Sequence, residues 1–180
     1  MGTRKLILYI SCSLDGFIAK PNDDLDFLSI VQREGEDYGY YDFIKTVDTV
    51  IVGRRTYDWV INQGVDFPHL DKESYIITRQ VKPSKGKLTF FNGDLKELVL
   101  ELKAKKGKNI FCDGGSEIVN QLLSENLIDE LILSVIPIIV GDGVKLFKEG
   151  IPGQELQLVS AKSYDSGLVQ LHYNVCKPMK

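Results

Sequence analysis

Residues 49–57 read TVIVGRRTY, an apolar strand followed at once by the start of a helix. We expect the strand over 48–52 and the helix over 54–62, with Gly53 as the tight turn between them. The same order recurs in NIFCDGGSE at 109–117, where a strand leads into a helix whose apolar positions lie within 118–123. Because strands alternate with helices, the pattern predicts an α/β domain with a largely parallel sheet.

Further segments extend this pattern toward both ends of the chain. We expect strands over 5–12, 74–78, 88–91 and within 128–140, and helices over 25–32, 40–45 and 95–102. Residues 169–175 alternate apolar and polar side chains after a turn at 165–167. This predicts a C-terminal antiparallel hairpin with one face buried and the other, including His172, in solvent. Residues 1–180 show no linker, so we expect a single domain.

The composition excludes several classes of protein. The chain has 180 residues, a formal net charge of −3 and a pI near 5.5. Nucleic acid and anionic membranes are therefore not expected as main partners, since proteins that bind them are usually basic. No apolar run reaches the ~20 residues of a membrane span. Three widely spaced cysteines, Cys12, Cys112 and Cys176, predict reduced thiols in a cytoplasmic protein.

Three strand ends carry the residues of a candidate site. Arg54 and Arg55 stand in the first turn of a helix, where their charge opposes the helix dipole unless an anion binds there. Taken alone, an anion site and two solvent-facing arginines are about equally favoured. At 113–117, adjacent glycines allow close approach of a ligand to the backbone, and Ser116 can cap the next helix, although a plain turn fits as well. Thr78 and Arg79 stand at the carboxyl end of the strand over 74–78, where an arginine taken alone more often lies in a solvated loop.

Together these segments place two helix starts and three arginines at one edge of the sheet. Ligands of open α/β sheets bind at the carboxyl ends of the strands. No acidic residue is positioned to hold a ribose 2′-hydroxyl, whereas arginines suit a 2′-phosphate, so NADP is favoured over NAD. His69 and His172 are isolated, and we expect no metal site. Asp23, Asp24 and Asp26 crowd a predicted helix start, where they either cap the helix or supply one buried acid.

Five segments in order resemble a known family. SLDGFIA at 13–19 resembles the opening signature of the reductase domain of bacterial riboflavin synthesis, which is similar in fold to dihydrofolate reductase. VGRRTY at 52–57 resembles the Gly-Arg-x-Thr cofactor motif of dihydrofolate reductases, and Thr78-Arg79 resembles their pair at the 2′-phosphate. DGGS at 113–116 resembles the double-glycine turn, and PIIVGDGVKLF at 137–147 resembles a late segment of the riboflavin branch.

The resemblance implies a dihydrofolate reductase-like α/β sandwich with helices on both faces of the sheet. It implies an NADPH-dependent reductase that passes hydride to a small heterocyclic substrate, as in 5-amino-6-(5-phosphoribosylamino)uracil reductase. The alternatives are a dihydrofolate or pterin reductase, and a non-catalytic protein that binds NADPH or a phosphosugar. A homodimer through the late strands is also implied.

The same resemblance assigns roles to individual residues. Asp24 or Asp26 would donate the proton or anchor the substrate in the folate-like case, and Asp15 would lie on the substrate side in the riboflavin-like case. The cofactor-binding positions are Ile10, Ile18, Gly53, Arg54, Arg55, Thr56, Thr78, Arg79, Gly114, Gly115, Ser116 and Glu117.

Overall fold

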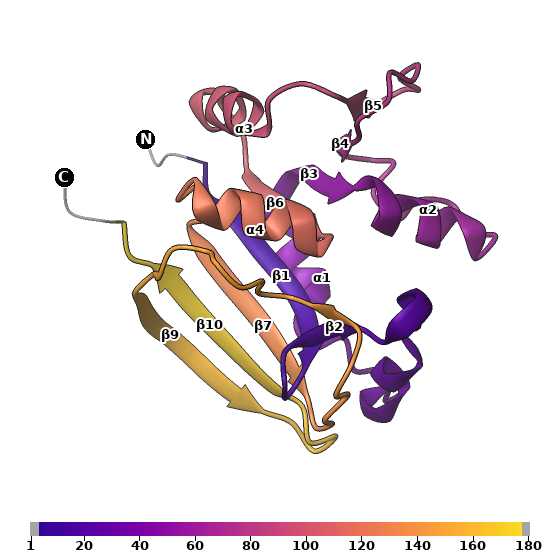
Figure 1. Cartoon of the computed structure of the whole chain (residues 1–180), viewed down its shortest axis with the longest axis vertical. Coiled ribbons are helices and arrows are strands. Elements are labelled where there is room, and N and C mark those ends of the chain that lie inside the picture. The colour runs from indigo at the N-terminus through magenta and orange to yellow at the C-terminus, as the bar shows by residue number, and fades with distance from the viewer. Residues whose placement is uncertain (1–3, 178–180) are drawn as a thin grey trace.

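Ten strands form two sheets in the computed structural model, which describes residues 4–177. The strands are β1 (Leu6–Ser13), β2 (Phe17–Ala19), β3 (Val47–Gly53), β4 (Glu73–Ile77), β5 (Leu88–Phe91), β6 (Asn109–Gly114), β7 (Glu130–Ile136), β8 (Val144–Lys145), β9 (Leu156–Ser163) and β10 (Val169–Val175). Eight of them build one sheet in the order β5-β4-β3-β6-β1-β7-β10-β9, while β2 and β8 pair separately (Figure 1).

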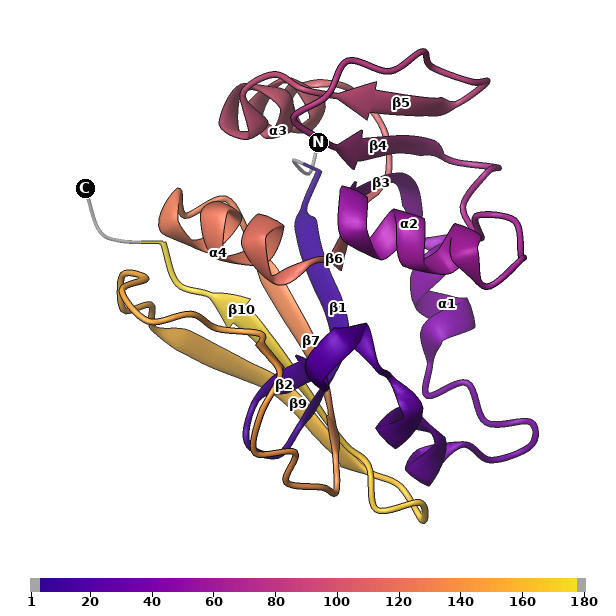
Figure 2. The same cartoon turned by 45° about the vertical axis from the view of Figure 1, so that its right-hand side comes forward.

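The helices lie on the two faces of the large sheet. They are α1 (Tyr40–Lys45), α2 (Arg54–Asn62), α3 (Leu95–Ala104) and α4 (Ser116–Ser124), with two 3₁₀ turns, η1 (Pro21–Asp23) and η2 (Asp26–Val31). Figure 2 shows α3 and α4 on one side of the sheet and α1 and α2 on the other. The expected helices over 40–45 and 54–62 are confirmed at both ends.

Strand β1 is an interior strand of the parallel part of the sheet. It pairs in parallel with β6 on one edge and with β7 on the other. Successive side chains of a strand point to opposite faces, and here both faces are covered. Leu6 and Leu8 pack with the helices α3 and α4, whereas Ile7 packs with Phe43 of α1 and with Phe111. This two-sided burial explains why the first strand of the chain is apolar almost throughout.

The segment over 25–32 is not a regular helix. Asn22 and Asp23 have positive φ angles of 63° and 60°, and Asp24 is extended, so the chain turns before it can enter an α-helix. Only the six-residue 3₁₀ helix η2 follows, and its Phe27 and Val31 are buried against Ile136 and Leu168. The 21–31 segment is therefore built from two short 3₁₀ turns instead of one helix.

The C-terminal hairpin is confirmed, but its predicted faces are not. Strand β10 pairs antiparallel with both β7 and β9. Its polar side chains are half-buried. His172 Nε2 lies 3.0 Å from Glu130 Oε2, and the side-chain amide of Gln170 donates a hydrogen bond to the Tyr9 hydroxyl. The prediction that His172 faces solvent is wrong, because Tyr9 of β1 and Glu130 of β7 contact the polar side chains of β10.

Strand β9 forms the outer edge of the sheet, and all eight of its residues are exposed. The homodimer expected through the late strands stays a prediction. Cys12 and Cys112 are buried and Cys176 is exposed, all three with free thiols. None of the helices within residues 4–177 combines the length and apolar character needed to span a bilayer.

Candidate functional site

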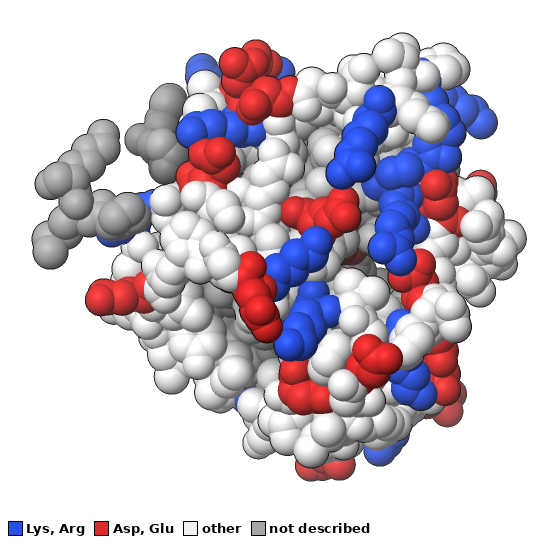
Figure 3. All heavy atoms as spheres, in the orientation of Figure 1, with Lys and Arg blue, Asp and Glu red and all other residues white. Residues whose placement is uncertain are grey.

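A cavity of about 1060 Å³ opens at the carboxyl ends of β1, β3, β4 and β6. The edge predicted from the sequence is therefore the edge that is hollowed. Figure 3 shows basic and acidic side chains intermingled on the face that contains it. The basic residues that line the cavity are Arg54, Arg55, Arg79 and Lys148, and the acidic ones are Asp23, Asp58, Asp113 and Glu117.

Two helix starts meet at this cavity with their backbones in contact. Gly53 precedes α2 and Gly115 precedes α4, and neither helix start has a side-chain cap. A Cβ on Gly115 would lie 3.5 Å from the Gly53 Cα and 3.4 Å from the Thr56 hydroxyl oxygen. Gly115 has φ +88° and Gly114 has φ +105°. Residues other than glycine rarely adopt these backbone conformations. The uncapped N–H groups of two helices can thus converge on one anionic ligand.

Ser116 does not cap α4, contrary to the sequence-based expectation. Gly115 is the N-cap residue, and Ser116 is already the first residue of the helix. Its hydroxyl instead donates to the carbonyl oxygen of Lys145 at 2.6 Å and ties α4 to the segment around β8. Ser116 still lines the cavity, so its role toward a pyrophosphate stays a prediction.

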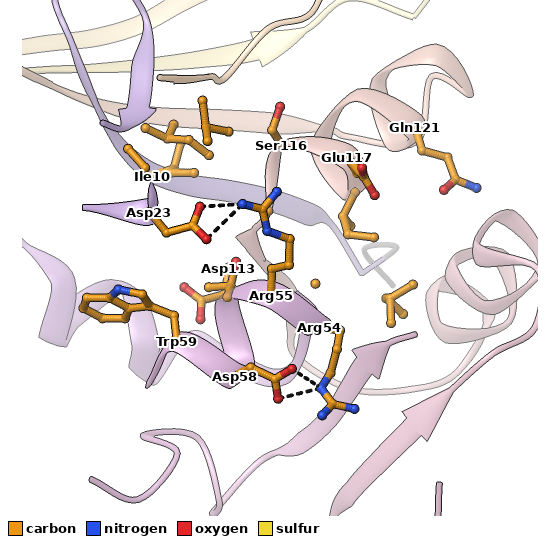
Figure 4. A pocket seen from close by; sticks show the side chains of 18 of the residues that line it. Ile10, Asp23, Arg54, Arg55, Asp58, Trp59, Asp113, Ser116, Glu117 and Gln121 are labelled. Carbon is orange, nitrogen blue, oxygen red and sulfur yellow. Dashed lines mark hydrogen bonds and ion pairs between the residues drawn. The ribbon is translucent and has the colours of Figure 1, made fainter. Parts of the chain in front are cut away.

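Both arginines of α2 already have carboxylate partners. Arg54 Nε lies 2.6 Å from both carboxylate oxygens of Asp58, and its guanidinium stacks 5.5 Å from the ring centre of Phe90. Arg55 reaches in the opposite direction to Asp23, a hydrogen bond that raises the pKa of Arg55 (Figure 4). An incoming anion would therefore compete with two carboxylates.

The third arginine is almost unattached. Arg79 is 95% exposed, and its closest carboxylate, that of Glu117, is 3.9 Å away. The Thr78 hydroxyl accepts a hydrogen bond from the backbone N–H of Gln80 at 3.1 Å, which holds a turn at the end of β4. Ile10 and Ile18 also line the cavity, and their contact with a nicotinamide stays a prediction. Arg79 is thus free to bind an anionic group that enters from solvent.

None of the three expected catalytic acids lines the cavity. Asp15 accepts hydrogen bonds from Ser13 and from the backbone N–H groups of Val140 and Gly141, which lowers its pKa to about 2. Asp24 accepts from the N–H of Asp26, and the carboxylate of Asp26 pairs with Lys20 at 2.6 Å. Asp15 therefore fastens two loops together, and a catalytic role for these acids stays a prediction.

Asp58, Trp59 and Asp113, which were not singled out from the sequence as site residues, add polar groups to the cavity. Asp23 lines it as well, the one member of the acidic cluster at 23–26 that does so. Figure 4 shows Asp23, Trp59 and Asp113 among its lining side chains. Two of them could have been found from the sequence. Trp59 is its one tryptophan, and Asp58 stands four residues after Arg54, the spacing of an ion pair on one helix face. Asp113 was noted only as part of a glycine turn. Its carboxylate lies 3.6 Å from Nε2 of His69, a buried side chain behind the cavity wall.

Two tyrosines separate this cavity from a second one of about 540 Å³. Tyr9 and Tyr40 line both. Tyr9 donates to the carbonyl oxygen of Tyr38, and burial raises its pKa to about 12. Burial and the nearby charge of Asp113 raise the pKa of Tyr40, so it too stays protonated at neutral pH. The Tyr40 hydroxyl makes no hydrogen bond with the described residues 4–177 and can donate to a ligand.

Comparison with known proteins identifies the family of this chain. The family model of the RibD C-terminal domain matches residues 4–170. The chain belongs to the RibD C-terminal domain family. This is a riboflavin-biosynthesis reductase-like family with the dihydrofolate reductase-like fold, which confirms the resemblance and the fold class predicted from the sequence.

Relatives of this RibD C-terminal domain protein are similar over nearly their whole length. The uncharacterized protein YwjB of Bacillus subtilis (strain 168) is 43% identical over 171 residues, which are 94% of this chain and 97% of YwjB. A Shewanella sp. PV-4 protein, assigned provisionally by its name to riboflavin biosynthesis, is 28% identical with a TM-score of 0.88, over 96% of this chain and 99% of that one.

A more distant match is informative about the fold alone. The deaminase/5-amino-6-(5-phosphoribosylamino)uracil reductase of Thermotoga maritima is 14% identical with a TM-score of 0.72. The match covers 97% of this chain and 57% of the Thermotoga protein. The present fold is therefore similar to one part of that longer enzyme.

Proposed function

We propose that this protein is an NADPH-dependent reductase that transfers hydride to a C=N or C=O carbon of a small heterocycle. The observation that carries the proposal is the contact between Gly53 and Gly115, which brings two uncapped helix starts to one cavity. Two such helix ends are suited to the paired phosphates of a dinucleotide. Membership in a reductase-like family supports the same activity.

The residues present fit NADPH. The backbone at Gly53, Arg54 and Thr56 and the start of α4 at Gly115 would hold the pyrophosphate. Any side chain at Gly115 would meet the Thr56 hydroxyl and narrow this cradle. Arg79 and Thr78, at the end of β4, would hold the 2′-phosphate, because the guanidinium of Arg79 carries a fixed charge, is 95% exposed and has only a 3.9 Å contact with Glu117.

When bound, NADPH would supply the hydride, and the protein would orient the two reactants and exclude water. A proton must also reach the substrate. The Tyr40 hydroxyl is the side chain best placed to hold that proton, since it lines the cavity, stays protonated and has no other described partner. Asp24, Asp26 and Asp15, expected from the resemblance to take part, lie outside the cavity lining.

The test is to measure cofactor binding and turnover separately. A thermal-shift comparison of NADPH, NADH and buffer is expected to give a shift of roughly 5–10 °C with NADPH at about 100 times its Kd, and a much smaller shift with NADH. Family membership makes 5-amino-6-(5-phosphoribosylamino)uracil the first compound to test by loss of NADPH absorbance, with dihydropterins second. No shift with either cofactor would overturn the proposal.

The second candidate is a protein that binds NADPH without catalysis. The observation that favours it is the position of Asp15, Asp24 and Asp26, none of which lines the cavity. It predicts a full NADPH shift with no oxidation by any aminouracil, pterin or folate. Turnover with one of these compounds would exclude it.

A further inference from the structure

Trp59 differs from the other aromatic residues of the cavity. Four aromatic side chains line it, those of Tyr9, Tyr40, Trp59 and Phe111. Tyr40 stands edge-on to both Tyr9 and Phe111, with ring centres 5.7 and 6.5 Å away, so these three rings pack on one another. Within residues 4–177, Trp59 takes part in no such ring contact, and its indole N–H has no hydrogen-bond partner although it is not sealed from solvent.

The side chain of Trp59 is also not used to hold α2 on the sheet. Tyr57 and Val60, three positions apart on one helix face, do this by packing against Val52 and Ile76. Trp59 is half-buried and belongs to none of the hydrophobic clusters formed by the described residues. An indole carries a large apolar surface, and an uncovered part of it is stabilised when a ligand covers it. The position of Trp59 therefore indicates binding rather than packing.

Trp59 shares a face of α2 with Arg55, which stands four positions earlier. Arg55 pairs with Asp23, so the 21–31 segment is attached to this same face of the helix. Figure 4 shows Trp59 on the side of Asp23, away from the guanidinium of Arg54. The indole thus lies where α2 and the 21–31 segment meet at the cavity.

This place is separate from the groups assigned to the cofactor. Trp59 stands six positions after Gly53, which is roughly 9 Å along the helix axis. The proposed function puts the pyrophosphate at the helix start and the 2′-phosphate at Arg79. Leu25 and Leu28 of the 21–31 segment line the cavity as well, and both are apolar. Trp59 and these leucines therefore border the part of the cavity that is left for the substrate.

Charge gives this cavity little attraction for a substrate. Its four basic and four acidic residues sum to no net charge. Each arginine lies beside a carboxylate, in the pairs Arg54–Asp58, Arg55–Asp23 and Arg79–Glu117, and the other two charged residues are Lys148 and Asp113. Stacking on an aromatic side chain does not depend on net charge, and it changes the affinity for a flat base by roughly 5- to 150-fold.

We propose that Trp59 is the residue that binds the ring of the substrate, by stacking its indole on the face of a flat heterocycle. This inference rests on the proposed function, since that function assigns the helix starts and Arg79 to NADPH. It makes Trp59 a determinant of specificity, which selects planar rings over puckered ones.

The test uses two probes that differ in planarity. Uracil and 5,6-dihydrouracil have the same N–H and C=O groups, but only uracil is flat. Each is titrated into the full chain saturated with NADP⁺, and binding is followed by calorimetry and by tryptophan fluorescence. Because Trp59 is the one tryptophan of the sequence, this fluorescence reports on that side chain alone.

We expect uracil to quench the fluorescence to saturation, with a Kd at least fivefold lower than that of 5,6-dihydrouracil. Equal Kd values, binding of uracil without a change in fluorescence, or binding of neither probe would overturn the inference. NADP⁺ binding is measured first, so its absence would be recognised as a failure of the proposed function instead.

Two variants of Trp59 separate stacking from apolar bulk. Trp59→Leu removes the ring and is expected to lose at least fivefold in affinity for uracil by calorimetry, with NADP⁺ affinity changed less than twofold. Trp59→Phe keeps a ring and is expected to stay within threefold of wild type.

Phe147→Leu is the matched control, because Phe147 is 39% exposed and lies outside the cavity lining. Thermal unfolding checks that all three variants are folded. No loss in Trp59→Leu, an equal loss in Phe147→Leu, or a loss in Trp59→Phe as large as in Trp59→Leu would contradict stacking by Trp59.

Discussion

Arg55 and Asp23 are joined across the cavity by two hydrogen bonds of 2.7 and 2.9 Å from one guanidinium nitrogen. The residues are 32 positions apart in the chain and come from α2 and from η1. The family resemblance places Arg55 among the residues that would hold the cofactor phosphates. The carboxylate of Asp23 then competes with the cofactor phosphates for the Arg55 guanidinium. Cofactor binding would therefore be coupled to the position of the 21–31 segment, which carries Asp23.

Asp23→Asn should therefore tighten NADPH binding. Removal of the carboxylate releases Arg55 and takes one negative charge from the cavity. An exposed ion pair contributes roughly 0.2–1 kcal/mol, so we expect about a two- to fivefold lower Kd for NADPH by calorimetry. Asp26→Asn is the control, because its carboxylate pairs with Lys20 outside the cavity lining. An unchanged or weaker affinity in Asp23→Asn would mean that Arg55 does not bind the cofactor.

Arg79→Ala should separate the two nicotinamide cofactors. Only NADPH carries the 2′-phosphate, and a charge-assisted hydrogen bond to a phosphate contributes roughly 1.5–3 kcal/mol. We expect at least a tenfold loss of affinity for NADPH and less than a twofold change for NADH. Lys82→Ala removes a charge three residues away and is expected to change neither by more than twofold. Equal losses for both cofactors in Arg79→Ala would contradict a 2′-phosphate site at this position.

Gly115→Ala should impair both folding and cofactor binding. Gly115 has φ +88° and ψ +116°, a strained conformation that costs a residue with a Cβ about 1–3 kcal/mol, and that Cβ would lie against Gly53 and Thr56. Gly150→Ala is the matched control, because Gly150 has φ +84° but no heavy atom within 4 Å of its added Cβ. Both variants should lose comparable unfolding free energy in urea, and only Gly115→Ala should bind NADPH more weakly. Equal NADPH affinities of the Gly115→Ala and Gly150→Ala variants would show that the turn at Gly115 is not part of the cofactor site.

Asp15→Asn should change how stability depends on pH. Hydrogen bonds from Ser13 and Val140 hold the pKa of Asp15 at about 2 in the folded protein, below the ~3.9 of an unfolded chain. A carboxylate with a lowered pKa stabilises the fold above its unfolded pKa and stops doing so as the pH falls through its folded pKa. Wild type should therefore exceed the variant in urea midpoint at pH 5, and the gap should close between about pH 4 and pH 2.

The control for this measurement is Asp165→Asn, whose urea midpoint should follow wild type at every pH. A difference between Asp15→Asn and wild type that stays constant down to pH 2 would show that the loop contact does not depend on the charge of Asp15.

Local sequence patterns predicted the parallel core well. The apolar runs before Gly53 and Gly114 form the strands β3 and β6, as predicted. The helix over 54–62 begins and ends at the predicted residues. These elements follow from the period of their apolar residues and from the glycines that end the strands. The order of the strands in the sheet depends on packing between distant segments, so it could not be obtained in the same way.

The partners of the site arginines were the main feature that local patterns missed. Asp58 stands four residues after Arg54 on one helix face, so that pair was visible in principle. Asp23 meets Arg55 only because η1 folds back over the carboxyl ends of the strands. The positive φ angles of Asn22 and Asp23 produce this return, and no hydrophobic period marks them.

The interior position of β1 in the sheet also has a consequence for synthesis of the protein. Its partners β6 and β7 lie at residues 109–114 and 130–136, so β1 is flanked on both edges by strands that are made much later. About 120 residues must be added before both edges of β1 are paired, which takes on the order of 6–25 s at typical elongation rates. During that interval an eight-residue, strongly apolar segment has unpaired backbone groups on both edges. Residues 6–13 are therefore an aggregation-prone segment of the nascent chain until β7 has been made.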